Sequence, residues 1–170
     1  NDIEETIEEM VRSINEAQIV MLPGGFSGGD EPDGSGKFIA TTFRNPKIKD
    51  AVSNLLEHRD GLMLGICNGF QALIKLGLVP YGKITEPSPQ APTLTFNTIG
   101  RHISRMVYTR VTSVKSPWLS GVNAGDVFTV PVSHGEGRFV ASDAVMQQLI
   151  ENGQVAFQYT TPCGKPSGDV

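Results

Sequence analysis

Cysteine is scarce in this sequence, and what the chain lacks excludes several classes of protein. The 170 residues contain only two cysteines, Cys67 and Cys163, and their wide separation fits neither a disulfide framework nor a metal site. We therefore predict a reducing, cytoplasmic location. No apolar run approaches the ~18 residues that a membrane span needs, and no signal-peptide pattern stands at the start. The sequence thus predicts neither a secreted protein stabilised by disulfides nor a membrane protein.

An excess of basic residues is also missing. Lysine and arginine number 14 against 18 acidic residues, which gives a net charge of -4. This balance predicts neither nucleic acid nor an acidic membrane as a partner. The apolar fraction of 39% and the charged fraction of 19% are ordinary for a globular protein. We predict one domain over residues 1–170, incomplete at both ends, because the chain starts at Asn1 and stops in a polar stretch.

The first half of the chain alternates helix and strand patterns. Apolar residues at three- to four-residue spacing predict an amphipathic helix over 2–16, and the apolar run 17–22 predicts a buried strand. A second helix is predicted from Pro46 to about residue 60, then a strand over 62–66 and a helix from Cys67 to about Gly77. This alternation is typical of βαβ units, so we expect an α/β fold with a mostly parallel sheet.

The second half has a different pattern. Three prolines, at positions 87, 89 and 92, interrupt any regular element. Residues 106–114 and 126–132 alternate apolar and polar side chains, which predicts antiparallel or edge strands. A helix is predicted over 143–152 and a last strand over 154–159. We find no internal repeat.

The chemistry of the sequence centres on Cys67, in the segment Gly65-Ile-Cys-Asn-Gly69. A nucleophile between two glycines is typical of a sharp strand-to-helix turn that exposes the side chain at the carboxyl end of the sheet. The helix start favours a thiolate, and the N–H of Asn68 can stabilise an oxyanion beside it. A buried, inert cysteine would need no flanking glycines. We therefore predict a catalytic Cys67 that attacks a carboxamide.

Two further segments are candidates for the same site. The loop Leu22-Pro-Gly-Gly-Phe-Ser27 leaves a buried strand, so Gly25 can supply a second oxyanion donor, although a phosphate cradle or a plain surface loop remain alternatives. The loop Ser133-His-Gly-Glu-Gly-Arg138 suggests a Cys–His–Glu triad with His134 and Glu136. Neighbours two residues apart rarely converge on a third residue, so these side chains could instead bind substrate or order the loop.

Together these segments resemble the class I glutamine amidotransferase family, and within it the glutaminase domain of phosphoribosylformylglycinamidine synthases. The resemblance rests on the Leu22 loop, on Gly65-Ile-Cys-Asn-Gly-Phe-Gln71, on Asn97-x-x-Gly-Arg101 and on Ser133–Arg138, in that order. It covers nearly the whole chain. It implies a flavodoxin-like open, mostly parallel sheet with helices on both faces.

The resemblance also implies an activity and roles for individual residues. Cys67 would form a glutamyl thioester, with Gly25 and Asn68 as oxyanion donors. The side chains or backbone of four further residues would hold glutamine: Phe26, Gln71, Ser133 and His134. The released ammonia would pass to a synthetase part, fused or separate, which binds ATP and Mg²⁺ and aminates formylglycinamide ribonucleotide in purine biosynthesis. No cofactor is expected in this chain.

The sequence departs from the family pattern in one respect. The family's base lies in a later His-Pro-Glu-like motif, and this sequence contains no such motif. We therefore expect little turnover from the isolated chain, because the base activates the thiol and protonates the leaving ammonia. Two alternatives stay open: another cysteine hydrolase of related fold, and an inactive module that binds a synthetase partner. Cys163 is expected to be an incidental surface thiol.

Overall fold

The computed structural model describes residues 2–25 and 36–168. The chain divides into two compact units, unit 1 (Asn1–Leu94) and unit 2 (Thr95–Val170), and each is described by itself. The short strand β3 (Thr93–Thr95) spans the boundary between them. Across the described ranges, no helix is both long and apolar enough to cross a membrane.

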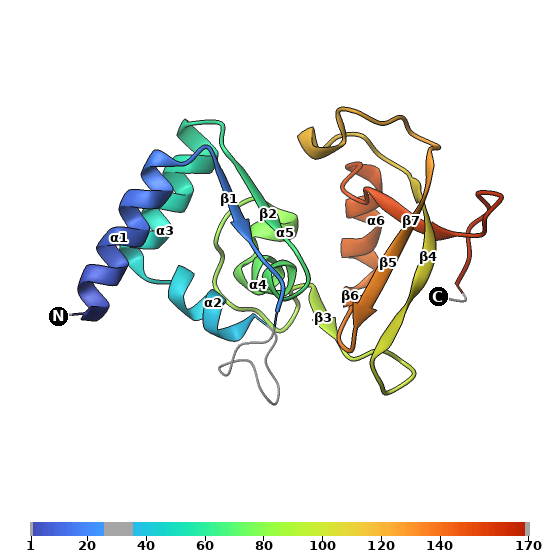
Figure 1. Cartoon of the computed structure of the whole chain (residues 1–170), viewed down its shortest axis with the longest axis horizontal. Coiled ribbons are helices and arrows are strands. Elements are labelled where there is room, and N and C mark those ends of the chain that lie inside the picture. The colour runs from blue at the N-terminus through green and yellow to red at the C-terminus, as the bar shows by residue number, and fades with distance from the viewer. Residues whose placement is uncertain (1, 26–35, 169–170) are drawn as a thin grey trace. The chain divides into compact units, whose positions relative to one another are not determined.

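Unit 1 combines helices with a two-stranded parallel sheet (Figure 1). Its elements are α1 (Asp2–Glu16), β1 (Ile19–Leu22), α2 (Lys37–Phe43), α3 (Pro46–Ser53), η1 (Asn54–His58), β2 (Leu62–Gly65), α4 (Asn68–Leu76) and α5 (Leu78–Tyr81). The predicted helix over 2–16 and the helix from Cys67 to Gly77 are confirmed as α1 and α4. The helix predicted from Pro46 continues from α3 into η1, which is a single π turn. Helix α2 was not predicted.

The parallel sheet has one face on the core and one face exposed. In the register, Val20 lies opposite Met63, and Met21 lies opposite Leu64. Val20 and Met63 pack against the core, whereas Met21 is 56% exposed. Parallel sheets are usually covered on both faces, as we predicted here. The part of the chain that the structure describes therefore contains a narrower and more exposed parallel sheet than the sequence suggested.

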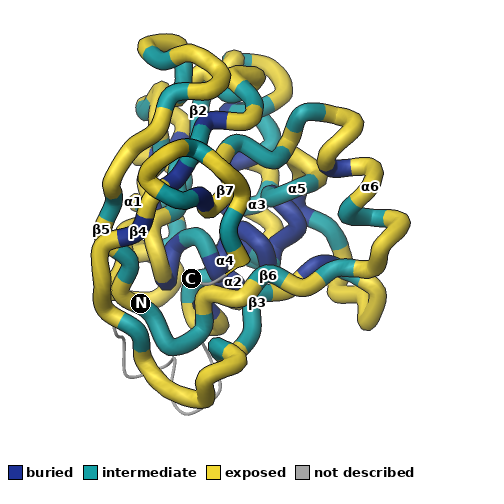
Figure 2. Tube along the Cα trace, turned by 90° about the vertical axis from the view of Figure 1, so that its right-hand side faces the viewer, coloured by how far each residue is buried: buried dark blue, intermediate teal, exposed yellow. Residues whose placement is uncertain are grey.

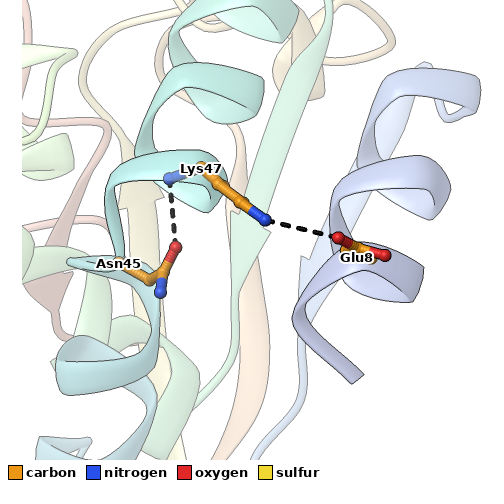
Figure 3. A network of polar contacts seen from close by, with 3 residues as sticks. All are labelled: Glu8, Asn45 and Lys47. Atoms are coloured by element: carbon orange, nitrogen blue, oxygen red, sulfur yellow. Dashed lines mark hydrogen bonds and ion pairs between the residues drawn. The ribbon is translucent and has the colours of Figure 1, made fainter. Parts of the chain in front are cut away.

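The core of unit 1 lies between its helices and the inner face of β1 and β2. Three side chains of α3 and η1 are essentially inaccessible: Ile48, Val52 and Leu55. Helix α1 packs beside α3, as Figure 1 shows. The Asn45 side chain caps α3 by accepting a hydrogen bond from the Lys47 N–H at 3.0 Å, and the Lys47 ammonium lies 3.3 Å from a Glu8 carboxylate oxygen of α1 (Figure 3). This ion pair is exposed and contributes little beyond orientation.

Unit 2 is built on a three-stranded antiparallel sheet. Its elements are β4 (Ile103–Val111), η2 (Pro117–Leu119), β5 (Val127–His134), β6 (Arg138–Val140), α6 (Asp143–Glu151) and β7 (Phe157–Thr160). Strand β4 lies between β5 and β7 and is antiparallel to both, which confirms the predicted antiparallel pairing. Val107 and Val111 of β4 are buried, whereas β5 is exposed over much of its length (Figure 2). The whole is a mixed α/β structure.

Candidate active site

Cys67 lies at a strained turn between β2 and α4. Its backbone has φ 52° and ψ -109°, and only one other described non-glycine residue, Asp60, has a positive φ. An L-residue holds such a conformation only where its surroundings impose it, and conformations of this kind concentrate at functional sites. The thiol is exposed and forms no disulfide. The predicted elbow is thus present, with the cysteine immediately before the first residue of α4.

The glycines around Cys67 let the backbone pass very close to β1. A Cβ atom on Gly69 would lie 2.0 Å from the Leu22 carbonyl oxygen, and one on Gly65 would lie 2.8 Å from the Gly69 carbonyl carbon. The Leu22 oxygen accepts a hydrogen bond from the Ile66 N–H at 2.9 Å. Since no side chain fits here, both glycines are required by packing. These contacts fix the turn, and with it the position of Cys67.

The loop that follows β1 runs beside the thiol. A Cβ atom on Gly24 would lie 3.0 Å from the Cys67 Cβ and 3.9 Å from its Sγ. The next residue, Gly25, has φ 128°, a value that side-chain-bearing residues rarely adopt. The structure therefore brings the glycine-rich loop and the predicted nucleophile together. Phe26, which the sequence assigned to glutamine binding, lies outside the described residues.

Asn68 and Gln71 lie in the first turn of α4. Both are buried, with 7% and 8% of their surface exposed, and the Gln71 N–H donates to the Cys67 carbonyl oxygen at 3.0 Å. Gly36, just before α2, packs on the same turn, since its Cβ would lie 3.0 Å from the Asn68 carbonyl oxygen. The helix start beside Cys67 is therefore rigid. The oxyanion role of Asn68 and the glutamine-binding role of Gln71 stay predictions.

Unit 2 contains a second polar cluster, organised by Asn97. The Asn97 amide nitrogen donates to the carbonyl oxygens of His134 at 2.8 Å and Arg101 at 3.1 Å. Its amide oxygen accepts from the Gly137 N–H at 3.3 Å and lies 3.0 Å from Nδ1 of His134. One asparagine thus connects the segment before β4 to the loop between β5 and β6.

These contacts define the protonation of the His134 ring. Because the Asn97 oxygen also accepts from a backbone N–H, which can only donate, the amide orientation is fixed and Nδ1 of His134 must carry a hydrogen. In the neutral ring, Nε2 therefore keeps its lone pair. Burial, and secondarily the charge of His102, lower the pKa of His134 below 6.5. The His102 ring is held by a contact of 3.0 Å between its Nε2 and the Ser133 hydroxyl.

We expect the imidazole of His134 to titrate below pH 6.5, and replacement of His102 by glutamine to move its midpoint upward. Glutamine can still bond Ser133 but carries no charge, so it removes only the repulsion between the two rings. The midpoint can be followed by NMR of the ring Cε1–H against pH. A midpoint at or above 6.5 in the unmodified chain would contradict the desolvated environment. His58→Gln serves as a control, because only burial and His102 lower the His134 pKa, and removal of the His58 imidazole should leave the His134 midpoint unchanged.

The predicted site residues therefore fall into two groups. Cys67, Gly25, Asn68 and Gln71 gather at the β2–α4 turn of unit 1, and Ser133 and His134 end β5 in unit 2. Sequence reasoning gave no role to Asn97 or His102, although both lie in or beside the Asn97-x-x-Gly-Arg101 motif that it noted. No cluster of metal-ligating side chains occurs within the described residues.

Comparison with known proteins shows to which family the chain belongs. A family model described as "CobB/CobQ-like glutamine amidotransferase domain" matches residues 2–170. The chain belongs to this family. The amidotransferase resemblance inferred from the sequence motifs is thereby confirmed, and the exposed cysteine on a glycine-flanked elbow is the nucleophile candidate of an amidotransferase domain.

Several relatives share a name that is narrower than the family description. The "Phosphoribosylformylglycinamidine synthase subunit PurQ" of Rhodospirillum rubrum is 39% identical over 146 residues, which cover 86% of this chain and 56% of the relative. The subunit of the same name from Methanococcus maripaludis is 35% identical over 150 residues, covering 88% and 53%. The solved "Structure of PurLQS from Thermotoga maritima" matches with a TM-score of 0.64 at 29% identity, covering 86% of this chain and 57% of that one.

The amidotransferase chain thus spans a little over half the length of the relatives it matches. It is related to PurQ over most of its own sequence.

Proposed function

We propose that this amidotransferase domain hydrolyses glutamine through a thioester on Cys67 and supplies ammonia for formylglycinamidine ribonucleotide synthesis. The observation that carries the proposal is the strained Cys67 elbow, with Gly24 in contact with the cysteine, in a chain of this family. The roles of Gly25, Asn68, Gln71 and Ser133–His134 are part of the proposal. Identity of 34–39% to several subunits of phosphoribosylformylglycinamidine synthases supports the choice of pathway.

The proposed reaction steps depend on the backbone turn that exposes Cys67. The Cys67 thiolate attacks the carboxamide carbon of glutamine, and the N–H groups of Gly25 and Asn68 stabilise the oxyanion that forms. The C–N bond then breaks, ammonia leaves with a proton supplied by a general acid, and a glutamyl thioester remains on Cys67. Water hydrolyses the thioester to glutamate and restores the thiol. The proton donor belongs to the His-Pro-Glu-like motif of the longer family members, which this sequence lacks.

The proposal includes a partner. Ammonia would pass to a synthetase part that binds ATP and Mg²⁺, as the match to a structure named PurLQS supports. We also infer that β1 and β2 belong to a flavodoxin-like sheet whose exposed face is covered by helices in the longer proteins. The exposed side chains of Ile19 and Met21 support this inference, since an apolar sheet face of this kind is normally covered.

A chimera tests this function. This chain would replace the matched 146 residues of the Rhodospirillum rubrum subunit, so that the relative's remaining segments supply the base. With that organism's synthetase, we expect glutamine-dependent product formation that falls about a thousandfold or more on Cys67→Ser, while ammonium-dependent formation is unchanged. The measurement is the rate with glutamine or with ammonium chloride as nitrogen donor.

A folded chimera that uses ammonium but never glutamine would contradict the proposal. Folding is checked by circular dichroism and by co-elution with the synthetase. The isolated chain is the matched comparison, and we expect it to release little or no glutamate. Rapid glutamate release by the isolated chain would place a base within it, with His134 the first residue to replace.

A further inference from the structure

Unit 2 contains a pocket of about 820 Å³ that is lined in part by His134, and its other lining residues have no role in the proposed glutaminase mechanism. It lies on one face of the β5–β4–β7 sheet. Ile103 lies opposite His134 in the register, and Arg105 lies opposite Val132, so these four alternate residues share a face. All four line the pocket, together with the two loops that Asn97 connects.

The charged side chains that line this pocket are all basic. Arg101, Arg105 and Arg138 line it with His102 and His134, and no aspartate or glutamate is found among the described lining residues. Glu136 belongs to the same loop but is not a lining residue. Three guanidinium groups thus lie close together, although the chain as a whole has a net charge of -4. Arg105 has an interaction within the protein, whereas Arg101 and Arg138 carry charges that a bound anion would neutralise.

The other four arginines of the chain each donate to an acceptor of the protein. Arg12 bonds to Glu9, Arg44 to the carbonyl oxygens of Thr85 and Lys75, Arg59 to those of Ile14 and Ala17, and Arg110 to Gly164 and Gln158. In contrast, the guanidinium groups of Arg101 and Arg138 are exposed and make no hydrogen bond or ion pair within the described residues. Two donors of fixed planar geometry therefore remain available at the pocket.

We propose that this pocket binds a small organic phosphate monoester. Guanidinium groups pair bidentately with phosphate oxygens, and a monoester carries a charge of about -1.5 to -2 near neutral pH. A carboxylate offers two oxygens and a single charge, so it matches the two available guanidinium groups of Arg101 and Arg138 less well. Ile103 and Val132 supply an apolar wall for the organic part of the ligand, as is usual in small-molecule sites.

The Asn97 network gives the site its rigidity. The Arg101 carbonyl oxygen accepts a hydrogen bond from the Asn97 amide, and Arg138 follows Gly137, whose N–H donates to the Asn97 side-chain oxygen. A Cβ atom on Gly137 would lie 2.3 Å from the His134 ring, so the loop is packed directly against that histidine. One shared set of hydrogen bonds therefore holds the backbone at both arginines before any ligand arrives, so only the two side chains must be ordered on binding.

Calorimetric titration tests the proposal with phenyl phosphate as the probe. Benzoate, with the same ring and one carboxylate, and inorganic phosphate, with no apolar part, are the comparison ligands. We expect saturable binding of phenyl phosphate at least about tenfold tighter than that of either comparison ligand. Arg101→Gln and Arg138→Gln should each weaken it about tenfold or more. Arg12→Gln, an equal charge change on the exposed surface of α1, should leave the affinity within about twofold.

Three results would overturn the proposal: no saturable binding of phenyl phosphate, equal affinity for benzoate, or equal weakening by Arg12→Gln. Arg101 and Arg138, the two substituted arginines, are exposed, and circular dichroism of each variant verifies the fold. The titration is repeated with Cys67→Ser, for which we expect unchanged affinity. Failure of the glutaminase proposal and failure of this one are therefore seen in separate measurements.

Discussion

Replacement of Gly69 by alanine is expected to lower the free energy of unfolding of the chain by about 3 kcal/mol, or to prevent unit 1 from folding. The added Cβ would lie 2.0 Å from the Leu22 carbonyl oxygen and 2.5 Å from its carbonyl carbon. Both are backbone atoms of β1, so no side-chain rotation can relieve the overlap. Either β1 or the start of α4 must shift. Urea unfolding followed by circular dichroism measures the loss.

Gly121→Ala is the matched control. Nothing lies within 4 Å of the Cβ that this change adds, and its backbone φ is not positive. We expect a change within about 0.5 kcal/mol. A Gly69→Ala protein as stable as the control would show that the turn around Cys67 is not closely packed against β1.

The second large effect concerns the two thiols. Cys67 is expected to be alkylated by a glutamine-like chloroketone at least about a hundredfold faster than Cys163, because a bound reagent is held next to the thiol that it attacks. Both cysteines are free and exposed, so exposure alone does not distinguish them. Intact-mass analysis against time, followed by peptide mapping, gives the rate at each site.

Two controls separate binding from intrinsic reactivity. Cys67→Ser should leave only the slow reaction of Cys163. Iodoacetamide, which lacks the α-amino and α-carboxylate groups of glutamine, should distinguish the two thiols far less than the chloroketone does. Equal selectivity with both reagents would assign the difference to the thiols themselves and not to a glutamine pocket.

Local patterns in the sequence were sufficient to predict most elements of unit 1. The periodicity of Ile3, Ile7, Met10 and Ile14 predicted α1 with its bounds, and the glycine pair around Cys67 predicted the elbow. These signals are contained within a few residues. Helix α2 was missed because its sequence Lys-Phe-Ile-Ala-Thr-Thr-Phe carries two threonines and no capping side chain before it.

The extent of the sheets could not be predicted in the same way. The run 17–22 indicates a buried parallel strand, yet the described structure leaves Ile19 and Met21 exposed. Burial of a strand depends on which other segments pair with it or cover it, and the strand's own sequence does not specify them. Of the mostly parallel sheet expected from the resemblance, the described residues contain the parallel pair β1 and β2 in unit 1, while the β5–β4–β7 sheet of unit 2 is antiparallel.

The candidate site shows the same division between local and long-range information. Cys67, Gly25 and Asn68 could be predicted as candidate site residues because their motifs are short and indicate a particular backbone geometry. The role of Asn97 depends on contacts with His134 and Gly137, which lie 37 and 40 residues further along the chain. Only the folded β4–β5 pair brings these segments together, so the motif was visible in the sequence while its partners were not.

The most direct test of the central claim is chloroketone labelling of Cys67 in the presence of excess glutamine. If the elbow forms a glutamine site, glutamine should protect Cys67 in a saturable manner, and glutamate or asparagine should protect it less. Labelling of Cys67 that is unaffected by glutamine, and no faster than that of Cys163, would contradict the assignment of Cys67 as a glutaminase nucleophile.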